Sequence, residues 1–405
     1  MASSSQIYCS HSLNEIIRLP VWRKLSHSLR QLSDWITQTQ IALTEIPSPT
    51  FHESNKAQYM AERFRDLGLE QIQTDSVGNV IAERPGYKSN KIWITAHLDT
   101  VVSTRDAIIV KHRDGRLCAP GISDNGAGLA SLLGITAALS KCPIETNLGL
   151  NFVANVGEEG EGDLMGMRHL FSQRDHCRHA AGVIVLDGGG SEHVTVAGIG
   201  SRRFIVELSG PGGHSWNHSD RVNPIRALSA AICMLSQVDL PSEPRTTLNI
   251  GAIQGGSAVN AIPQKAWMKV DIRSTDKKEI SRLARFLDTF VHKSAEQESK
   301  TATGKLEVRI QQIGDRPVAE LKPEAKILKV IQEADQHLGI QTRLERASTD
   351  ANIPLSLGIE AISIGGGGRG GEAHSSAEWF DPSGRELGLK RILLTTLMLA
   401  GIRAG

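Results

Sequence analysis

The stretch over residues 92–100 constrains the fold more than any other part of the chain. It is an apolar run that ends in His97, Leu98 and Asp99. Such a run is typical of a buried strand, and alternation of side chains along a strand places His97 and Asp99 on the same side. A carboxylate behind a histidine fixes the imidazole tautomer and raises its basicity, as a metal ligand requires. Taken alone, such a pair is more typical of an ion pair at a strand end.

Four further motifs at strand or loop ends each carry an acid or a histidine. They contain Asp124, Glu158 with Glu159, Asp187, and His374. Apolar strand patterns alternate with helical patterns around them, which predicts an α/β domain in which a mostly parallel sheet lies between two layers of helices. Ligands of such sheets bind at the carboxyl ends of the strands, so we expect these side chains to meet there.

The pattern changes near residue 201. From there to residue 312, strand-like and helical segments follow one another in the order βαββαβ. This order predicts a small ferredoxin-like domain. Because 405 residues exceed one ordinary core, at least two domains are expected. We expect a catalytic domain in two parts, residues 1–200 and 315–405, with the small domain, residues 201–314, inserted between them.

The composition excludes several classes of partner. Hydrophobic residues make up 40% and charged residues 22% of the chain, and the net charge is +1. With no basic run interleaved with aromatic residues, neither nucleic acid nor an anionic membrane is expected as a partner. The five cysteines are scattered without a Cys-x-x-Cys pair, as in a reduced cytoplasmic protein. The start of the chain lacks a secretory pattern, and no apolar run approaches the ~20 residues that span a bilayer.

The acids and histidines suit a site for two divalent metals. Carboxylates cancel the charge of two close cations, and imidazoles supply nitrogen ligands. A two-metal site also needs one bridging ligand and one nearby base that is not itself a ligand. Asp124 and Glu158 fit these two roles.

These motifs resemble those of a known family, the co-catalytic zinc exopeptidases and amidohydrolases. The family includes peptidase T, carnosinase-type dipeptidases, glutamate carboxypeptidase, aminoacylase and acetylornithine deacetylase. The likeness extends from Ile46 onward and includes the inserted domain. It is carried by the motifs Ala-His97-Leu-Asp99-Thr, Ser-Asp124-Asn-Gly-Ala-Gly, Gly-Glu158-Glu159-Gly, Leu-Asp187 and Ala-His374-Ser.

The resemblance implies a ligand set for the metals. His97 and Asp187 would hold one ion, Glu159 and His374 would hold the other, and Asp124 would bridge the two. The ions would be zinc, with manganese or cobalt as alternatives.

The resemblance also implies roles for residues that are not ligands. Asp99 would orient the histidine of the first motif, and Glu158 would be the general base. In the inserted domain, His214 would stabilise the reacting carbonyl oxygen, while Asn260 and Arg273 would hold the substrate.

One departure concerns the bridging position. The family often has an Asp-Asp pair there, joined by a cis peptide bond, whereas in this chain Asn125 follows Asp124. The bridging carboxylate is kept. The cis bond becomes less certain, because a non-proline cis bond costs about 3 to 4 kcal/mol and needs support.

Ordinary structural roles remain alternatives for several segments. Gly-Glu-Glu-Gly fits a solvated acidic turn, His214 fits a plain turn histidine, and Arg273 fits a structural ion pair with Asp271. The glycine-rich residues 365–371 lack the Gly-Lys-Ser/Thr ending of a phosphate loop. They indicate either a close backbone approach to substrate or a flexible hinge.

The sequence therefore predicts a metal-dependent hydrolase of amide bonds, an exopeptidase of small peptides with aminopeptidase, dipeptidase or tripeptidase activity. Deacylation of N-acyl amino acids is the alternative. Asp187 favours the peptidase, since in the resembling family aspartate here accompanies aminopeptidase-like and dipeptidase members, and glutamate accompanies carboxypeptidases and deacylases. A non-catalytic binding protein of the same fold is a third interpretation, which the complete ligand set disfavours. Edge strands of the inserted domain predict a homodimer.

Overall fold

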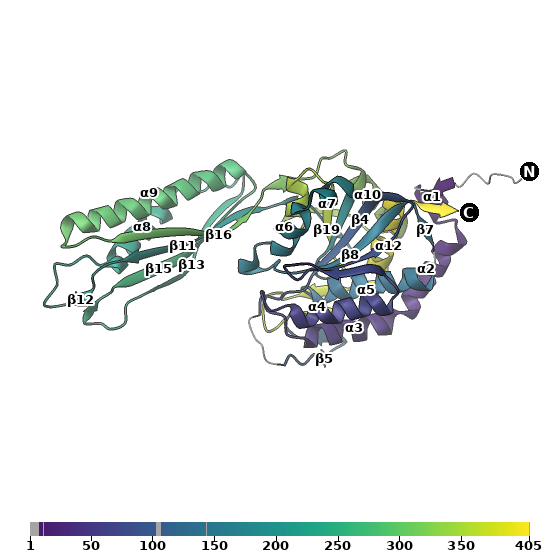
Figure 1. The fold of residues 1–405 in the computed structure, drawn as a ribbon, viewed down its shortest axis with the longest axis horizontal. Coiled ribbons are helices and arrows are strands. Elements are labelled where there is room, and N and C mark those ends of the chain that lie inside the picture. Colours follow the sequence, from purple (N-terminus) through teal and green to yellow (C-terminus); the bar gives the residue numbers. More distant parts are fainter. Residues whose placement is uncertain (1–7, 11, 103–106, 143, 405) are drawn as a thin grey trace, which may run out of the picture. The chain divides into compact units, whose positions relative to one another are not determined.

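The computed structural model describes residues 8–10, 12–102, 107–142 and 144–404. The chain divides into two compact units. Unit 1 comprises Met1–Gly198 and Glu320–Gly405, and unit 2, Ile199–Ala319, is inserted in it (Figure 1).

The elements of unit 1 form one large sheet, two small sheets and the helices around them. The helices are α1 (Leu13–Ile16), α2 (Pro20–Gln31), α3 (Ser33–Glu45), α4 (Ser54–Asp66), α5 (Gly126–Lys141), α6 (Met165–Ser172), α7 (Arg174–His179), α10 (Lys326–Leu338), α11 (Asn352–Ser356) and α12 (Arg385–Ala400), with a 3-10 turn at Gly160–Gly162. The large sheet has the order β17 (Ala319–Glu320), β10 (His193–Gly198), β19 (Ala361–Ile364), β9 (Ala180–Leu186), β4 (Lys88–His97), β8 (Leu148–Asn155), β3 (Val80–Arg84) and β2 (Glu70–Thr74), and β18 (Arg343–Ala347) pairs with β10. The small sheets are β1 (Tyr8–Ser10), β22 (Ile402–Ala404) and β7 (Glu145–Thr146), and β20 (Arg369–Gly371), β21 (Trp379–Asp381), β6 (Arg116–Cys118) and β5 (Lys111–Arg113).

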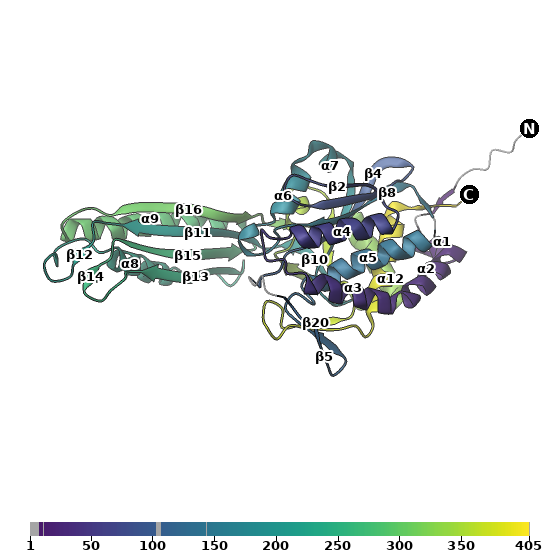
Figure 2. The same cartoon turned by 60° about the horizontal axis from the view of Figure 1, so that its bottom comes forward.

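The centre of the large sheet is parallel. Strand β4 pairs in parallel with β8 and β9, and β9 pairs in parallel with β19, whereas β3 and β10 join this centre antiparallel. Helices α2, α3, α4, α5 and α12 lie on one face, and α6 and α7 lie on the other (Figures 1 and 2). The predicted α/β class is confirmed, and the sheet is mixed.

Both faces of β4 are covered. The indole of Trp93 packs against Phe171 and His176, with ring centroids 5.7 Å and 4.9 Å away, on the side of α6 and α7. On the other face, α5 is buried along almost its whole length. A Cβ atom at Gly128 would lie 2.5 Å from the carbonyl oxygen of Leu186. Glycine there lets the start of α5 approach the end of β9, which brings two candidate site motifs together.

The N-terminal helical region differs from the expectation. The apolar spacing of Leu25, Leu29, Leu32 and Ile36 predicts one helix, but the structure has two, α2 and α3, which meet at Leu32. The amide of Leu32 donates to Ser28 at 3.0 Å, and the amide of Ile36 donates to Leu32 at 2.8 Å. Helical spacing therefore continues across the junction, so the apolar pattern does not reveal the break.

Unit 2 has the predicted βαββαβ order. Its elements are β11 (Gly200–Ser209), α8 (Pro224–Ser236), β13 (Thr246–Gly255), β15 (Lys265–Ser274), α9 (Lys277–Thr301) and β16 (Glu307–Arg316), with a pair of short strands, β12 (Gly213–His214) and β14 (Ala261–Ile262). The four long strands form an antiparallel sheet in the order β13-β15-β11-β16. Both helices pack on it through one core that includes Val206, Leu228, Met268 and Leu283.

A membrane-spanning segment was not expected, and among the described residues no helix combines the length and the apolar character needed to cross a bilayer.

Candidate metal centre

The five predicted ligands of unit 1 lie together where strands end. His97 is the last residue of β4, Glu159 and Asp187 follow β8 and β9, and Asp124 precedes α5. His374 follows β20 and reaches the same place from the C-terminal part of the chain. The carboxyl ends of the central parallel strands thus bring distant motifs to one edge of the sheet.

Asp124 lies between the two histidines. Its Oδ1 is 3.1 Å from His97 Nε2, and its Oδ2 is 3.0 Å from His374 Nε2. The outer partners are also near, since Asp187 Oδ1 is 3.9 Å from His97 Nε2 and Glu159 Oε1 is 3.1 Å from His374 Nε2. One carboxylate therefore serves both halves of the cluster, as a bridging ligand does.

Charge pairing in the cluster shifts the pKa of its members. Hydrogen bonds to Asp124 and then Glu159 raise the pKa of His374 to about 10. For His97, burial favours the neutral ring, but hydrogen bonds to Asp124, Asp187 and Asp99 outweigh it and raise the pKa well above its usual value. Burial would raise the pKa of Asp124, but hydrogen bonds from His374 and His97 lower it. Without metal, the two imidazoliums therefore offset part of the negative charge of the carboxylates around them.

Asp99 holds His97 and the turn after β8. The Nδ1 atom of His97 lies 3.0 Å from the backbone oxygen of Asp99 and 3.4 Å from its Oδ1. Because both partners are acceptors, Nδ1 carries a proton, and a ring that loses its Nε2 proton offers that lone pair to a metal. The same carboxylate accepts the backbone amides of Glu158 at 3.0 Å and Glu159 at 2.9 Å, and the hydroxyl of Thr50 at 2.9 Å.

Two residues that sequence analysis did not assign hold the Asp124 loop. The buried carboxylate of Glu378 accepts the amides of Gly121 at 2.7 Å, Ser123 at 2.8 Å and Asp124 at 2.9 Å. Glu378 lies four residues after His374, which is the only signal in the sequence. Burial raises the pKa of Glu378.

Asn125 is the second of these residues. Its Nδ2 donates to the backbone oxygen of Leu186 at 2.8 Å, and its Oδ1 accepts the amides of Gly128 and Gly188, each at 3.1 Å. The side chain thus links the start of α5 to the turn after β9. The Asp124–Asn125 peptide bond is cis, although asparagine stands where the family often has a second aspartate.

The donor set fits divalent metals. Within the described residues, one ligand atom each from His97, Asp124 and Asp187, and one each from Asp124, Glu159 and His374, lie within 4.8 Å of one another. Tetrahedral zinc with bonds of about 2.0 to 2.2 Å places its ligand atoms about 3.3 to 3.6 Å apart. Glu158 forms a third such group with His97 and Glu159, so its carboxylate reaches the edge of the cluster.

The unit 2 candidates are described within that unit. His214 and Asn260 come together, because β12 pairs with β14 and the amide of Ser215 donates to the backbone oxygen of Asn260 at 3.0 Å. The amides of Trp216 and Asn217 donate to His214 Nδ1 at 3.2 Å and 3.5 Å. Two donors to Nδ1 leave the proton of the neutral ring on Nε2, where it can be donated.

Arg273 makes the ion pair that the sequence offered as the alternative to substrate binding. Its Nε donates to Asp271 Oδ2 at 2.6 Å, within the same strand β15. A role in holding substrate stays a prediction.

The glycine-rich residues 365–371 have a packing role. The amides of Gly366 and Gly367 donate to the backbone oxygens of Gly188 and Gly190, at 2.9 Å and 3.0 Å. A Cβ atom at Gly365 would lie 2.6 Å from the oxygen of Gly189. The run therefore lets two backbones touch beside Asp187; an approach to substrate stays a prediction.

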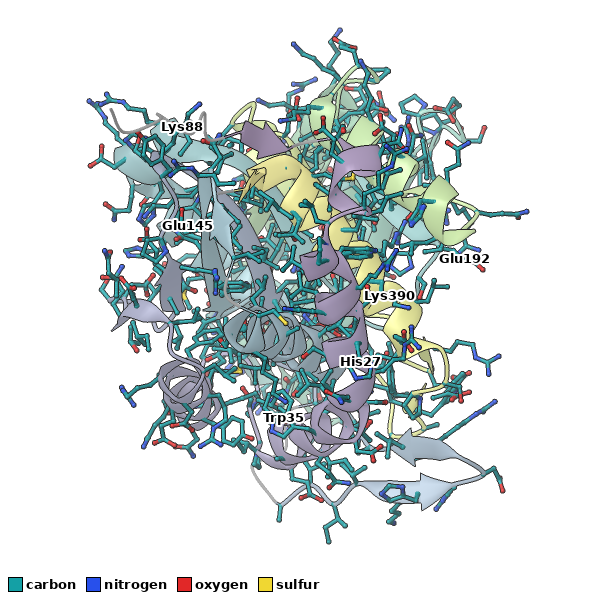
Figure 3. All side chains as sticks on the ribbon, turned by 90° about the vertical axis from the view of Figure 1, so that its right-hand side faces the viewer. His27, Trp35, Lys88, Glu145, Glu192 and Lys390 are labelled. Carbon is teal, nitrogen blue, oxygen red and sulfur yellow. The ribbon has the colours of Figure 1, made fainter. Side chains whose placement is uncertain are left out.

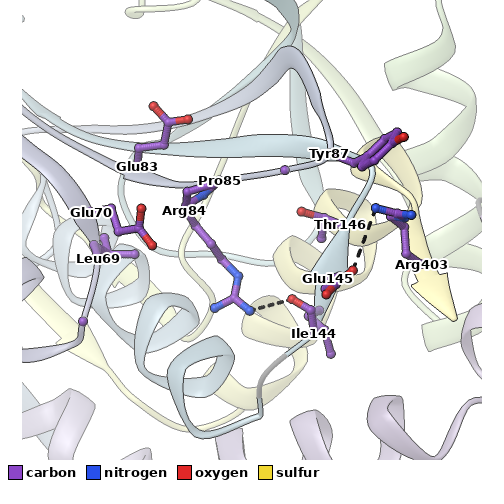
Figure 4. Close-up of a pocket in the computed structure, with 12 residues that line it drawn as sticks. Leu69, Glu70, Glu83, Arg84, Pro85, Tyr87, Ile144, Glu145, Thr146 and Arg403 are labelled. Atoms are coloured by element: carbon purple, nitrogen blue, oxygen red, sulfur yellow. Dashed lines mark hydrogen bonds and ion pairs between the residues drawn. The ribbon is translucent and has the colours of Figure 1, made fainter. Parts of the chain in front are cut away.

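A cavity of about 430 Å³ lies at the opposite end of β4 (Figure 4). Arg84 lines it and donates to the oxygens of Leu139 at 3.3 Å and Ile144 at 2.7 Å, while Arg403 stacks on Tyr87 at 4.0 Å from the ring centroid. Figure 3 shows Glu145 and Lys88 on this part of unit 1. The two arginines are occupied by internal contacts, and β4, about 30 Å long at ~3.3 Å per residue, separates the cavity from the metal ligands.

The fold and the ligand cluster define the class of a metallohydrolase. The chain belongs to peptidase family M20/M25/M40, whose model matches residues 93–397. It is 28% identical over 267 residues to the succinyl-diaminopimelate desuccinylase of Corynebacterium glutamicum, covering 64% of this chain and 71% of the relative.

Solved structures share the fold over more than nine tenths of the chain. A tripeptidase from Staphylococcus aureus superposes with a TM-score of 0.74 at 23% identity, covering 91% of this chain and 98% of that chain. The YXEP protein of Bacillus subtilis, described as a dinuclear metal binding peptidase, superposes with a TM-score of 0.64 at 17% identity, covering 92% of this chain and 99% of that chain.

Proposed function

We propose that this chain is a two-metal exopeptidase that acts on small peptides. The observation that carries the proposal is Asp124, whose two carboxylate oxygens contact the histidines of two separate ligand groups. His97 and Asp187 would hold one metal, and Glu159 and His374 the other. The dinuclear description of the YXEP protein supports the metal count, and the tripeptidase supports a peptide substrate.

Bound divalent ions would polarise the scissile carbonyl and lower the pKa of water. Glu158 would take a proton from the attacking water and pass it to the leaving amine. The backbone at Glu158 is held because its amide donates to Asp99 at 3.0 Å. His214 would donate from Nε2 to the oxygen that becomes negative in the transition state. We propose that a second copy of the chain pairs through unit 2, so that His214 acts within its own chain or across the dimer.

A second function is favoured by one relative. The C. glutamicum protein is a desuccinylase, and removal of an N-acyl group uses the same chemistry on another amide. The aspartate at position 187 favours the peptidase through the family resemblance.

A substrate panel decides between the two functions. The metal-loaded protein should cleave di- or tripeptides, and N-acetylation of a cleaved peptide should abolish turnover. N-acetyl and N-succinyl amino acids serve as the matched competing substrates. Faster hydrolysis of the blocked compounds would identify a deacylase, and hydrolysis of neither group would refute both functions.

A further inference from the structure

The loop that leads into Asp124 is held by side chains from two sides. On one side, the carboxylate of Glu378 accepts three of its backbone amides. On the other side, the Nε2 atom of Gln40 donates to the backbone oxygen of Ile122 at 2.5 Å. Ile122 is fully buried, and among the described residues no other donor reaches its backbone oxygen. Gln40 therefore satisfies a carbonyl group that water does not reach.

The orientation of the Gln40 side chain is set by an arginine. Gln40 is fully buried on α3, and its Oε1 accepts a hydrogen bond from the guanidinium of Arg385. Arg385 also donates to Thr37 Oγ1 at 3.3 Å and lies over the ring of Phe380, 4.7 Å from the centroid. Because a guanidinium only donates, the oxygen of the Gln40 amide faces Arg385 and the nitrogen faces Ile122.

Arg385 is a buried charge without an acidic partner. It is 3% exposed, and among the described residues no carboxylate forms an ion pair with it. Burial lowers the pKa of Arg385 to about 10, so the guanidinium stays charged at neutral pH. The residue also begins α12, where a cation opposes the helix dipole. A buried charge is unfavourable unless it is paired, so packing alone does not explain an arginine at this position.

Position 40 suits the loop better than it suits the arginine. A glutamate would give Arg385 a stronger, charged hydrogen bond, but it would turn an acceptor toward the oxygen of Ile122. A methionine would fill similar space and serve neither neighbour. Of these three side chains of similar length, only glutamine accepts from Arg385 and donates to Ile122 at the same time.

We propose that Gln40, oriented by Arg385, is a positioning residue that holds the loop carrying the bridging carboxylate of Asp124. Ile122 lies two residues before Asp124, so a shift of its peptide group moves the carboxylate that faces both histidines of the cluster. Gln40 acts through the backbone, since its side-chain hydrogen bonds go to Ile122 and Arg385. The catalytic part of this inference rests on the proposed function, whereas the anchoring of the loop does not.

The test compares Gln40→Met with Ile36→Ala. Both residues are fully buried on α3, but Ile36 packs against Gly134 in the middle of α5. Gln40→Met should weaken metal binding about 10-fold and lower kcat at saturating metal about 10-fold, at the low end of the effects of groups that orient ligands, with KM unchanged. In the metal-free protein, hydrogen exchange at the amides of residues 121, 123 and 124 should become faster. Ile36→Ala leaves a cavity and lowers the melting temperature, but it should change none of the other quantities.

Gln40→Glu separates positioning from stability. The introduced carboxylate pairs with Arg385, so this variant should melt no lower than Gln40→Met, yet its kcat should fall at least as far. Recovery of kcat together with stability would mark a purely structural glutamine and overturn the proposal. If Gln40→Met does not fold, Gln40→Glu is compared with the wild type and Ile36→Ala by the same criteria.

A double-mutant cycle with Arg385→Met tests the route. Without the guanidinium the Gln40 amide is free to rotate, so Arg385→Met should lower kcat about threefold in the wild type and by less in the Gln40→Met background. Additive effects, or an unchanged kcat or exchange rate in Gln40→Met, would overturn the proposal. A wild-type protein without hydrolytic activity would refute the proposed function instead, and the exchange rates and metal affinities would still decide the positioning.

Discussion

The candidate ligand cluster of unit 1 and the His214 region of unit 2 are built in opposite ways. In the cluster, Asp99 is fully buried and its oxygens accept three donors besides the contact with His97. In unit 2, His214 and Asn260 are exposed, on or beside strands of two residues. Fixed dipoles and charges lower a barrier best when they need no reorganisation, whereas residues that meet a substrate must remain reachable. Under the proposed function, this contrast corresponds to a preorganised chemical centre in unit 1 and a substrate-binding region in unit 2.

Substitution of Glu158, the proposed general base, should give the largest effect on kcat. Glu158→Gln removes the proton acceptor but keeps the side-chain shape, so kcat should fall by about 10² to 10⁴. Metal content, measured on the purified protein, should stay unchanged. Glu161→Gln, on the next turn, is the control. If Glu158→Gln loses metal, Glu158 is a ligand and its role has been exchanged with that of Glu159.

Substitution of His214 in unit 2 should give the next largest effect on kcat. His214→Ala removes one donor to the developing oxyanion and should lower kcat by about 10² to 10³ without changing metal content. His292→Ala, on the exposed side of α9, is the matched control. An unchanged kcat would remove His214 from the mechanism.

Mixed dimers of Glu158→Gln and His214→Ala subunits refine this prediction. Restored activity requires one subunit to donate its histidine to the other. A verified heterodimer without activity places both groups in the same chain.

Asn125 tests the scaffold between the cluster and the sheet. In Asn125→Asp, the donor to Leu186 is lost and a carboxylate faces that carbonyl oxygen. Leaving a buried polar group unsatisfied costs about 1 to 3 kcal/mol, and denaturant unfolding of the metal-free protein should show a loss of this size. Asn90→Asp, at the exposed start of β4, should change stability by less than about 0.5 kcal/mol. Equal effects at both positions would contradict the scaffold role.

The smallest effect is the pH dependence of the metal-free protein. The folded-state pKa of His374, about 10, lies above the usual value of 6.5, so protonation favours the folded state. This stabilisation is fully present below pH 6.5 and is lost as pH rises toward 10. Thermal unfolding in chelator should follow this course, and His374→Gln should flatten it. Metal should restore stability at high pH, because neutral imidazoles are the ligands. A flat profile for the unmodified chain would refute the charge pairing.

The candidate ligands could be anticipated because their signal is local. His97, Glu159 and Asp187 each follow an apolar run, and parallel strands bring their carboxyl ends to one edge. The βαββαβ order of unit 2 is local in the same sense. These three candidate ligands were therefore predictable because each lies at the end of a strand that the apolar pattern marks.

The supporting residues gave no such signal. Glu378 binds amides about 255 positions earlier in the chain, and Glu53 binds one 104 positions later. Their partners are backbone N–H groups, which every residue except proline has, so side-chain patterns carry no trace of the pairing. The break between α2 and α3 at Leu32 was not predicted either, because the helical spacing of the apolar residues continues through it.

Where the chain leaves and re-enters unit 1 has a consequence for modularity. Strands β10 and β17 are neighbours in the large sheet, and the amide of Leu321 donates to the oxygen of Val196 at 2.8 Å. Residues 199–319 are therefore an insertion whose two ends are held side by side by the large sheet of unit 1. Closing a flexible loop costs only about 0.6 kcal/mol more for each doubling of its length, so an insertion at this junction can vary in length without altering the strand order. The inserted unit can therefore vary while the candidate ligands at the ends of β4, β8 and β9 keep their places.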